Sequence, residues 1–202
     1  RKEVESDYHL CRCCGKRPET VEHVVDHCLP LMPMITARHN AIVNRLAAAL
    51  PSTVTKKLLD RNPLGGRGVR PDLTVWKEDG EIVIVDVTCP FEKDELALDD
   101  AFQHKASKYS ALARTLACGS VRSVVVRPFV VGALGGWHPG NEQCLDDLGI
   151  KRHRKKLLRE LCVADAIIGS EAIWSRLERG ITNERSTAIE STPQHAPITT
   201  SS

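Results

Sequence analysis

Hydrophobic positions along this chain follow helical spacing in some segments and strand spacing in others. Apolar side chains from Ile42 to Leu50 recur every three or four residues, so residues 36–50 are predicted to form a helix that Pro51 ends. The patterns further along predict strands over residues 73–76, 81–88 and 121–131, and helices over about residues 96–117, 143–163 and 164–179. This order indicates an α/β domain with a small mixed sheet.

The two ends of the chain lack this periodicity. Residues 1–32 are rich in cysteine and histidine and are too short for an apolar core of their own. Residues 182–202 are rich in Ser, Thr and Pro, so we expect a disordered tail there. The main domain is therefore predicted to cover residues 33–181. Because the chain begins with Arg1, we expect it to be a fragment of a longer or processed protein.

The charge of the chain is unevenly distributed. The 202 residues include 28 Lys and Arg against 26 Asp and Glu, a net charge of +2 that by itself hardly suggests a nucleic-acid partner. However, an acidic centre around residues 78–100 is offset by a basic C-terminal half. This asymmetry suits a protein that binds cations at one site and phosphates at another, although scattered solvated charge would give it as well. No apolar run is long enough for a membrane span, so no membrane partner is expected.

A cluster of cysteine and histidine near the N-terminus has the spacing of a metal site. Cys11, Cys14, His23 and Cys28 follow the pattern C-x2-C-x8-H-x4-C, which supplies three thiolates and one imidazole to a tetrahedral structural zinc ion. The spacing leaves two alternatives open, because Cys13 could replace Cys14 and His27 could replace His23. Reduced cysteines without a metal are the alternative, and zinc binding is the stronger interpretation. Three basic residues within this module, Arg12, Lys16 and Arg17, could contact DNA phosphates.

Two aspartates mark the ends of the predicted hairpin. Asp72 opens the first strand, Asp86 lies near the end of the second, and Asp79 is midway between them in the turn. A simple hairpin register brings the two carboxylates within about 5–8 Å of each other. Such a pair could bind Mg²⁺ together with a substrate phosphate, whereas either aspartate alone more often caps a turn.

Several cationic and polar residues could serve this carboxylate pair. Lys105, Lys108 and Tyr109 have the spacing of one helix face, where an ammonium group could stabilise negative charge on a phosphate. A solvated helix flank is the simpler explanation for such a face. The remaining residues that we expect to contact DNA are Arg38, His39, Arg70 and Tyr109, and the basic run of Lys151, Arg152, Arg154, Lys155 and Lys156.

These motifs occur in an order that resembles a known family. The series is Cys11-Arg-x-Cys14, Pro18-Glu19-Thr20, His23, Cys28, Arg38-His39-Asn40, Arg70-Pro71-Asp72, Asp86-Val-Thr88 and Lys105-x-x-Lys108-Tyr109. It is similar to the C-terminal end of the polyprotein of site-specific non-LTR retrotransposons that insert into insect ribosomal RNA genes. In that family a zinc knuckle precedes a restriction-like endonuclease of the PD-(D/E)xK type.

The resemblance implies a metal-dependent nuclease in the nucleus. It would nick double-stranded DNA, in a ribosomal RNA gene, and leave a 3′ hydroxyl that primes reverse transcription. The reverse transcriptase, an RNA-directed DNA polymerase that binds the element RNA, would lie upstream of this fragment. Asp72 and Asp86 match the family's acidic Mg²⁺ ligands, whereas Thr88 stands where the general motif has lysine. The resemblance therefore assigns the lysine role to Lys105 or Lys108.

Two other functions fit the same residues. One is a nucleic-acid-binding zinc module attached to an inactive nuclease fold, and the other is an unrelated repair or recombination nuclease on the same core.

Overall fold

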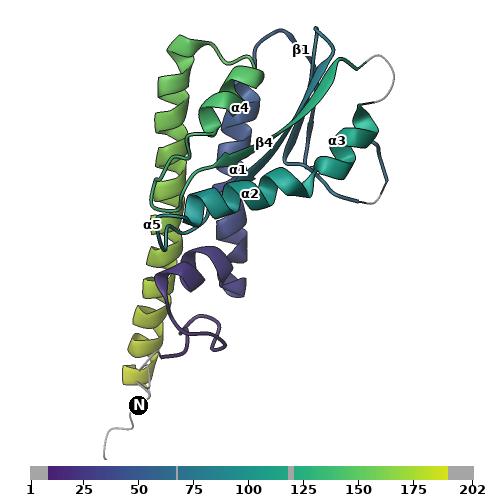
Figure 1. Ribbon diagram of the computed structural model, residues 1–202. Helices are drawn as coiled ribbons and strands as arrows, with labels where there is room; N and C mark the ends of the chain where they lie inside the picture. Colours follow the sequence, from purple (N-terminus) through teal and green to yellow (C-terminus); the bar gives the residue numbers. More distant parts are fainter. Residues whose placement is uncertain (1–8, 67, 118–120, 191–202) are drawn as a thin grey trace, which may run out of the picture.

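The computed structural model describes residues 9–66, 68–117 and 121–190, with residues 181–190 described as backbone. Two short helical turns, η1 (His23–His27) and η2 (Leu29–Leu31), precede the main elements. These are α1 (Met32–Ala49), β1 (Val54–Leu59), β2 (Leu73–Lys77), β3 (Glu81–Thr88), α2 (Ala97–Lys108), α3 (Ser110–Leu116), β4 (Ser123–Val130), α4 (Asn141–Asp147) and α5 (Arg152–Glu190), as Figure 1 shows. The predicted α/β class is confirmed.

The sheet is mixed, with the strand order β1-β2-β3-β4. The pairs β1–β2 and β2–β3 are antiparallel, whereas β3 and β4 run parallel and are joined through α2 and α3. Strand β1 is absent from the prediction. It lies at the edge of the sheet and exposes Lys56 and Lys57, so its sequence carries little of the apolar signal of a buried strand.

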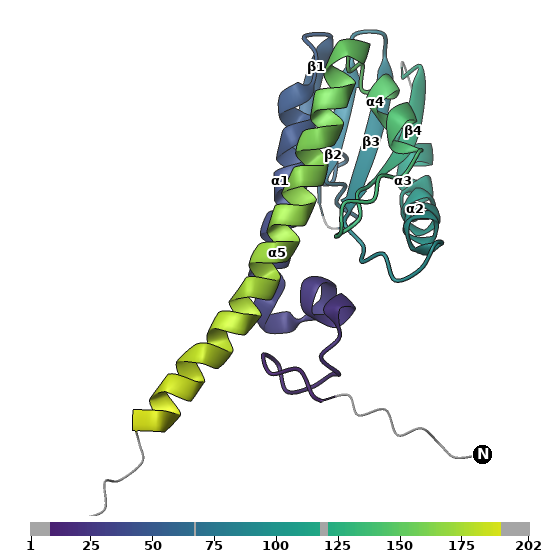
Figure 2. The same cartoon turned by 90° about the vertical axis from the view of Figure 1, so that its left-hand side faces the viewer.

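Helices cover both faces of the sheet, which gives three layers (Figure 2). Residues of β3 at odd positions, such as Val83 and Val85, belong to the large core on the side of α1, α4 and α5. Residues at even positions, such as Ile82 and Ile84, pack in a smaller core with Tyr109 and Leu112 on the α3 side. Strand β3 is therefore buried on both faces, which explains its nearly continuous run of β-branched residues.

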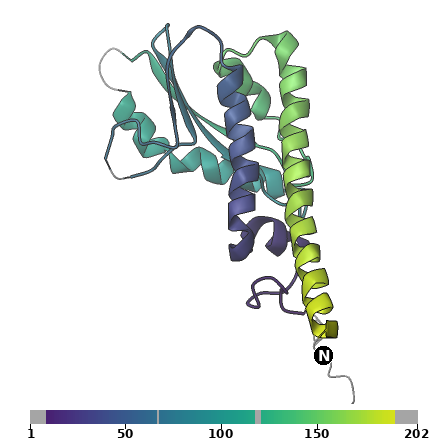
Figure 3. The ribbon, with the colours of Figure 1, turned by 180° about the vertical axis from the view of Figure 1, so that it is seen from behind.

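The C-terminal helices α4 and α5 are separated at residues 148–151 and not near residue 164. Gly149, whose φ is +75°, follows the short helix α4, and α5 then continues without a proline from Arg152 to Glu190. The predicted boundary near residue 164 is therefore wrong, and so is the disordered tail as far as residue 190. Residues 191–202 of that predicted tail lie outside the described residues. Figure 3 shows α5 beside α1, where Arg45 pairs with Asp165.

The cysteine–histidine module is packed onto the rest of the molecule. Val24, Val25 and Leu31 belong to the same continuous apolar core as the sheet residues. Helix α1 begins at Met32 and not at residue 36 as predicted, and Pro33 lies in its first turn, where the missing N–H costs no hydrogen bond. No helix in the described part of the chain is long and apolar enough to cross a membrane.

Candidate functional site

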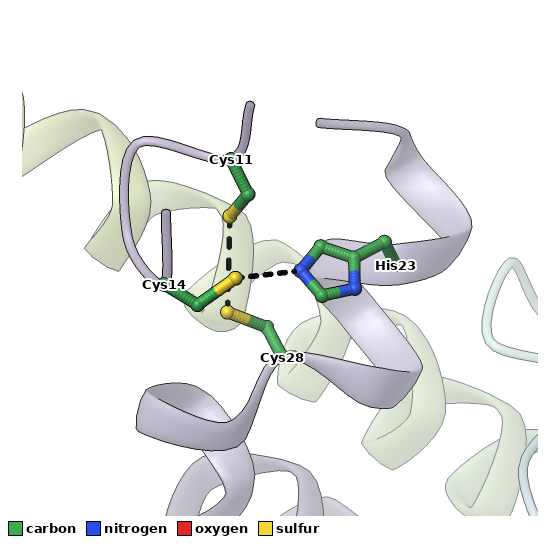
Figure 4. A group of neighbouring side chains, drawn as sticks. All are labelled: Cys11, Cys14, His23 and Cys28. Atoms are coloured by element: carbon green, nitrogen blue, oxygen red, sulfur yellow. Dashed lines mark hydrogen bonds between the residues drawn. The ribbon is translucent and has the colours of Figure 1, made fainter. Parts of the chain in front are cut away.

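Four side chains of the N-terminal module converge on one point (Figure 4). The ligand atoms of Cys11, Cys14, His23 and Cys28 all lie within 4.8 Å of one another. The Sγ atoms of Cys11 and Cys28 are 3.9 Å apart, and the Sγ atom of Cys14 is 3.2 Å from Nε2 of His23. Tetrahedral zinc with Zn–S bonds of about 2.3 Å places neighbouring ligand atoms about 3.8 Å apart. This cluster could therefore hold a zinc ion.

The geometry decides between the ligands that the sequence left open. Cys14 and His23 belong to the cluster, whereas Cys13 is outside it and His27 is exposed. A tight turn brings the two cysteines together, because the Gly15 amide donates to the Cys11 carbonyl at 2.7 Å and Gly15 has a φ of +64°.

The electrostatics of the cluster also fit a metal-binding thiolate. Backbone amides, first that of Lys16, lower the pKa of the Cys14 thiol to about 6, while burial opposes the shift and His23 adds to it. Burial, together with the neighbouring Cys11, raises the pKa of Cys28. A divalent cation among these groups would favour the thiolate form of each cysteine.

A second group of polar side chains lies at one end of the sheet, where β2 begins and β3 ends. The register pairs Leu73 with Val85, so one further step puts Asp72 opposite Asp86, as the hairpin predicts. Asp86 is only 1 % exposed. A buried carboxylate requires partners that stabilise its charge.

The partners of Asp86 come from α2 and the residue that follows it. Lys105 forms an ion pair with Oδ2, and the Nζ atom of Lys108 lies 3.2 Å from Oδ1. The Tyr109 hydroxyl donates to Oδ1 and lies 3.1 Å from the Arg70 carbonyl. Burial, followed by the hydrogen bond to Asp86, raises the pKa of Tyr109. The helix predicted over residues 96–117 breaks at Tyr109, and both lysines and the tyrosine face the same carboxylate.

Asp72 is held from the opposite side. Its Oδ2 accepts a hydrogen bond from the Val87 amide at 2.6 Å and lies 3.2 Å from Nε2 of His39, on α1. The same His39 nitrogen is 3.3 Å from the Val87 carbonyl. Burial lowers the pKa of His39, but the hydrogen bond and charge of Asp72 outweigh burial, so the pKa is raised overall. Asp72, Val87 and His39 are therefore one connected group beside Asp86.

An open groove of about 390 Å³ adjoins Asp72. It is lined along α1 by Thr36, Asn40 and Asn44 and on the other side by Leu59 and Asp60. Thr36 and Asn44 were not among the site residues predicted from the sequence. Their signal is a polar residue at every fourth position, on the side of α1 that does not carry the apolar spacing.

Two residues that we expected to contact DNA are buried. Arg38 is 4 % exposed and is paired with Asp26 and Ser170, and Tyr109 is fully buried. As predictions of DNA contact these two are wrong, because neither side chain reaches the surface. Arg12 lies on the surface but is paired with Glu19, whereas Lys16, Arg17 and Arg70 are exposed.

The basic run lies at the other end of the sheet from the two aspartates. It opens α5, next to Gly149, which lies against Pro51 beyond the end of α1 (Figure 1). Because β3 lies between the two ends of the sheet, its length puts the basic run on the order of 20 Å from Asp86. Lys151, Arg152, Arg154 and Lys156 are exposed, whereas Lys155 is mostly buried against Asp146 at 2.7 Å.

No protein-family model matches this chain, and no curated protein matches it. The residues themselves show a mixed α/β fold with a four-stranded sheet and a cysteine–histidine cluster that could bind zinc.

Proposed function

We propose that this chain is a metal-dependent DNA endonuclease with a structural zinc knuckle, the nuclease part of a non-LTR retrotransposon polyprotein. The observation that carries the proposal is the surroundings of Asp86. This buried carboxylate lies opposite a second one, Asp72, and two lysines and a tyrosine contact it. One ammonium would be enough to neutralise one buried carboxylate, so a second lysine at the same carboxylate favours a site that also receives a negatively charged phosphate.

The oxygen atoms at this site fit Mg²⁺. Carboxylate oxygens of Asp72 and Asp86 and the Val87 carbonyl are hard ligands, and Mg²⁺ is commonly bound through only one or two carboxylates together with water and substrate phosphate. The His39 nitrogen already contacts two of these oxygens, one from Asp72 and one from Val87. When bound, Mg²⁺ supplies a hydroxide nucleophile and neutralises charge on the scissile phosphate.

The chain's own groups have separate roles in this proposal. Lys105, at 21 % exposure the more enclosed of the two lysines, stabilises the charge that develops on the phosphate. Lys108, at 38 % exposure, binds a neighbouring phosphate. The Tyr109 hydroxyl holds the Asp86 carboxylate in a fixed orientation, and the Val87 amide does the same for Asp72.

The surface around the site suits a double-stranded DNA substrate. The groove lined by Thr36, Asn40 and Asn44 leads to Asp72 and would give a DNA strand access to that carboxylate. The basic run on α5, on the order of 20 Å away, would contact the phosphate backbone about six base pairs from the cut. A ribosomal RNA gene as the target, an upstream reverse transcriptase that binds the element RNA, and the nucleus as the place of action follow from the family resemblance and are proposals.

The test is nicking of supercoiled plasmid DNA by the full chain in the presence of Mg²⁺. We expect Asp72→Asn and Asp86→Asn each to slow nicking by about 100-fold or more, because each removes a negative ligand of the cation. Asp147→Asn is the matched control. Asp147 is also a partly buried carboxylate in an ion pair, with Arg127, but its pair lies outside the site, so this variant keeps the wild-type rate.

The binding-module alternative has one observation in its favour, since both oxygens of Asp86 already have partners within the chain. The same experiment separates the two functions. Plasmid binding that is retained without any nicking by the wild-type protein identifies a nucleic-acid-binding module, and equal nicking by the wild type and Asp86→Asn excludes Asp86 from catalysis.

A further inference from the structure

The Arg38 side chain is a buried junction between four segments of the chain. Its Nη2 atom donates to Asp26 Oδ1 at 2.9 Å and to the Cys89 carbonyl at 3.2 Å, and its Nη1 atom donates to Ser170 Oγ at 2.7 Å. An arginine is rarely buried unless it is paired in this way. Arg38 therefore joins the cysteine–histidine module, helix α1, the segment after β3 and helix α5.

Asp26 connects this junction to the metal-binding cluster. It lies on η1 between two of the four cluster residues, His23 and Cys28. Its second oxygen, Oδ2, accepts a hydrogen bond from the Phe91 amide at 2.6 Å. Because the residues on both sides of Asp26 are held by the cluster, the geometry of the cluster fixes the position of this carboxylate.

The same junction reaches the carboxylate pair through β3. The carbonyl of Cys89 contacts Arg38, and two residues earlier the Val87 amide donates to Asp72. His39, the next residue of α1, contacts Asp72 and the Val87 carbonyl. Two consecutive residues of α1 thus hold the end of β3. Arg38 contacts it on the side of the cysteine–histidine module, and His39 contacts it on the side of the carboxylates.

Helix α5 leaves room for the Arg38 side chain at Gly169. A Cβ atom on Gly169 would lie 2.6 Å from Cγ and 2.7 Å from Cβ of Arg38, closer than carbon atoms pack. Any side chain at residue 169 would therefore displace the arginine.

We propose that Asp26 and Arg38 are positioning residues that couple the metal cluster to the carboxylate pair. Zinc at the cluster fixes Asp26, Asp26 and Arg38 fix the chain after β3, and this chain fixes Asp72. The coupling does not depend on the proposed nuclease activity, and it can be measured without DNA.

The experiment is hydrogen–deuterium exchange of the full chain, zinc-loaded and after removal of zinc with a chelator. In the wild type we expect zinc removal to raise exchange in residues 85–93 by about fivefold or more, the lower end of ordinary coupling between sites. Residues 123–130, in β4, serve as the internal reference and keep their exchange. In Asp26→Asn, exchange of residues 85–93 is already raised in excess zinc, and zinc removal adds little.

Two further variants separate coupling from general loss of stability. Asp165→Asn breaks another ion pair between α1 and α5, with Arg45, that touches neither the module nor β3, so it keeps the wild-type response to zinc. Gly169→Ala displaces the Arg38 side chain and leaves the Asp26 carboxylate in the sequence. We expect it to raise exchange of residues 85–93 as Asp26→Asn does. Since coupling is reciprocal, Asp26→Asn also weakens zinc binding by about fivefold or more in a chelator competition.

Three results would overturn the proposal. The first is a wild-type protein in which residues 85–93 do not respond to zinc. The second is an increase of equal size in β4, which means that zinc acts on the stability of the whole fold. The third is an Asp26→Asn protein with the zinc response of the wild type.

Discussion

At the scale of single residues, the proposed site depends on how much charge is gathered at Asp86. The carboxylate is buried, and Lys105, Lys108 and Tyr109 all contact it. The sequence predicted that these three residues share one helix face, because they are spaced three and four residues apart. It could not predict that Tyr109 is fully buried, because that depends on where α2 ends and how α3 packs on the sheet.

The two lysines are expected to contribute unequally to DNA cleavage. Lys105→Met removes the more enclosed ammonium and should slow nicking by about 100-fold, whereas Lys108→Met should slow it by less than about tenfold and weaken DNA binding instead. Single-turnover nicking rates and a binding titration of each variant check this prediction. A larger loss of rate in Lys108→Met than in Lys105→Met would exchange the two roles.

At the scale of secondary-structure elements, the sequence predicted the strands with the strongest apolar pattern and missed the others. The buried strand β3 has the predicted bounds, and its register with β2 follows from the turn around Asp79. Edge strand β1 and the last part of helix α5 were not predicted, and each has a physical reason. Half-exposed β1 has no apolar run, and the part of α5 beyond Gly180 has no apolar periodicity of its own.

Because α5 continues through Gly180, the effect of replacing this glycine on the stability of the fold can be predicted. The backbone of Gly180 is helical and a Cβ there would meet nothing within 4 Å, so Gly180→Ala should stabilise the fold by about 0.5–1 kcal/mol. Gly149→Ala is the control and should destabilise it, because Gly149 has a φ of +75°. Thermal unfolding of both variants measures the effect. A destabilised Gly180→Ala protein would mean that Gly180 ends the helix.

At the scale of the whole molecule, the cysteine–histidine module and the α/β domain are one packed unit. The sequence predicted the four ligands of the cluster because the spacing of cysteine and histidine is local information. It gave no sign of the contacts that join the module to α1, β3 and α5, because Asp26, Arg38, Cys89 and Ser170 are far apart in the sequence.

Thiol reactivity should report zinc binding within this unit. Because its pKa is lowered to about 6, the Cys14 thiol should react rapidly with iodoacetamide at pH 7.5 in zinc-free protein. Zinc should slow this reaction by about tenfold or more, because a thiolate bound to the metal is no longer free to react. Burial raises the pKa values of Cys89 and Cys162 to about 12, so both stay unlabelled in either state. Cys13 is outside the set of four and serves as the comparison thiol, whose labelling zinc should suppress less than that of Cys14. Peptide mass spectrometry after labelling measures each site.

An unchanged labelling rate of Cys14 on addition of zinc would contradict the zinc site. Equal protection of Cys13 and Cys14 would instead mean that zinc acts by general stabilisation of the module.

The nature of the DNA end left by the full chain tests the central claim most directly. After incubation of supercoiled plasmid with Mg²⁺, we expect open circles whose nick a DNA polymerase can extend, since the proposed hydrolysis leaves a 3′ hydroxyl. Asp86→Asn should yield about 100-fold fewer extendable nicks in the same time. The same yield of extendable nicks from the wild type and Asp86→Asn would contradict the account.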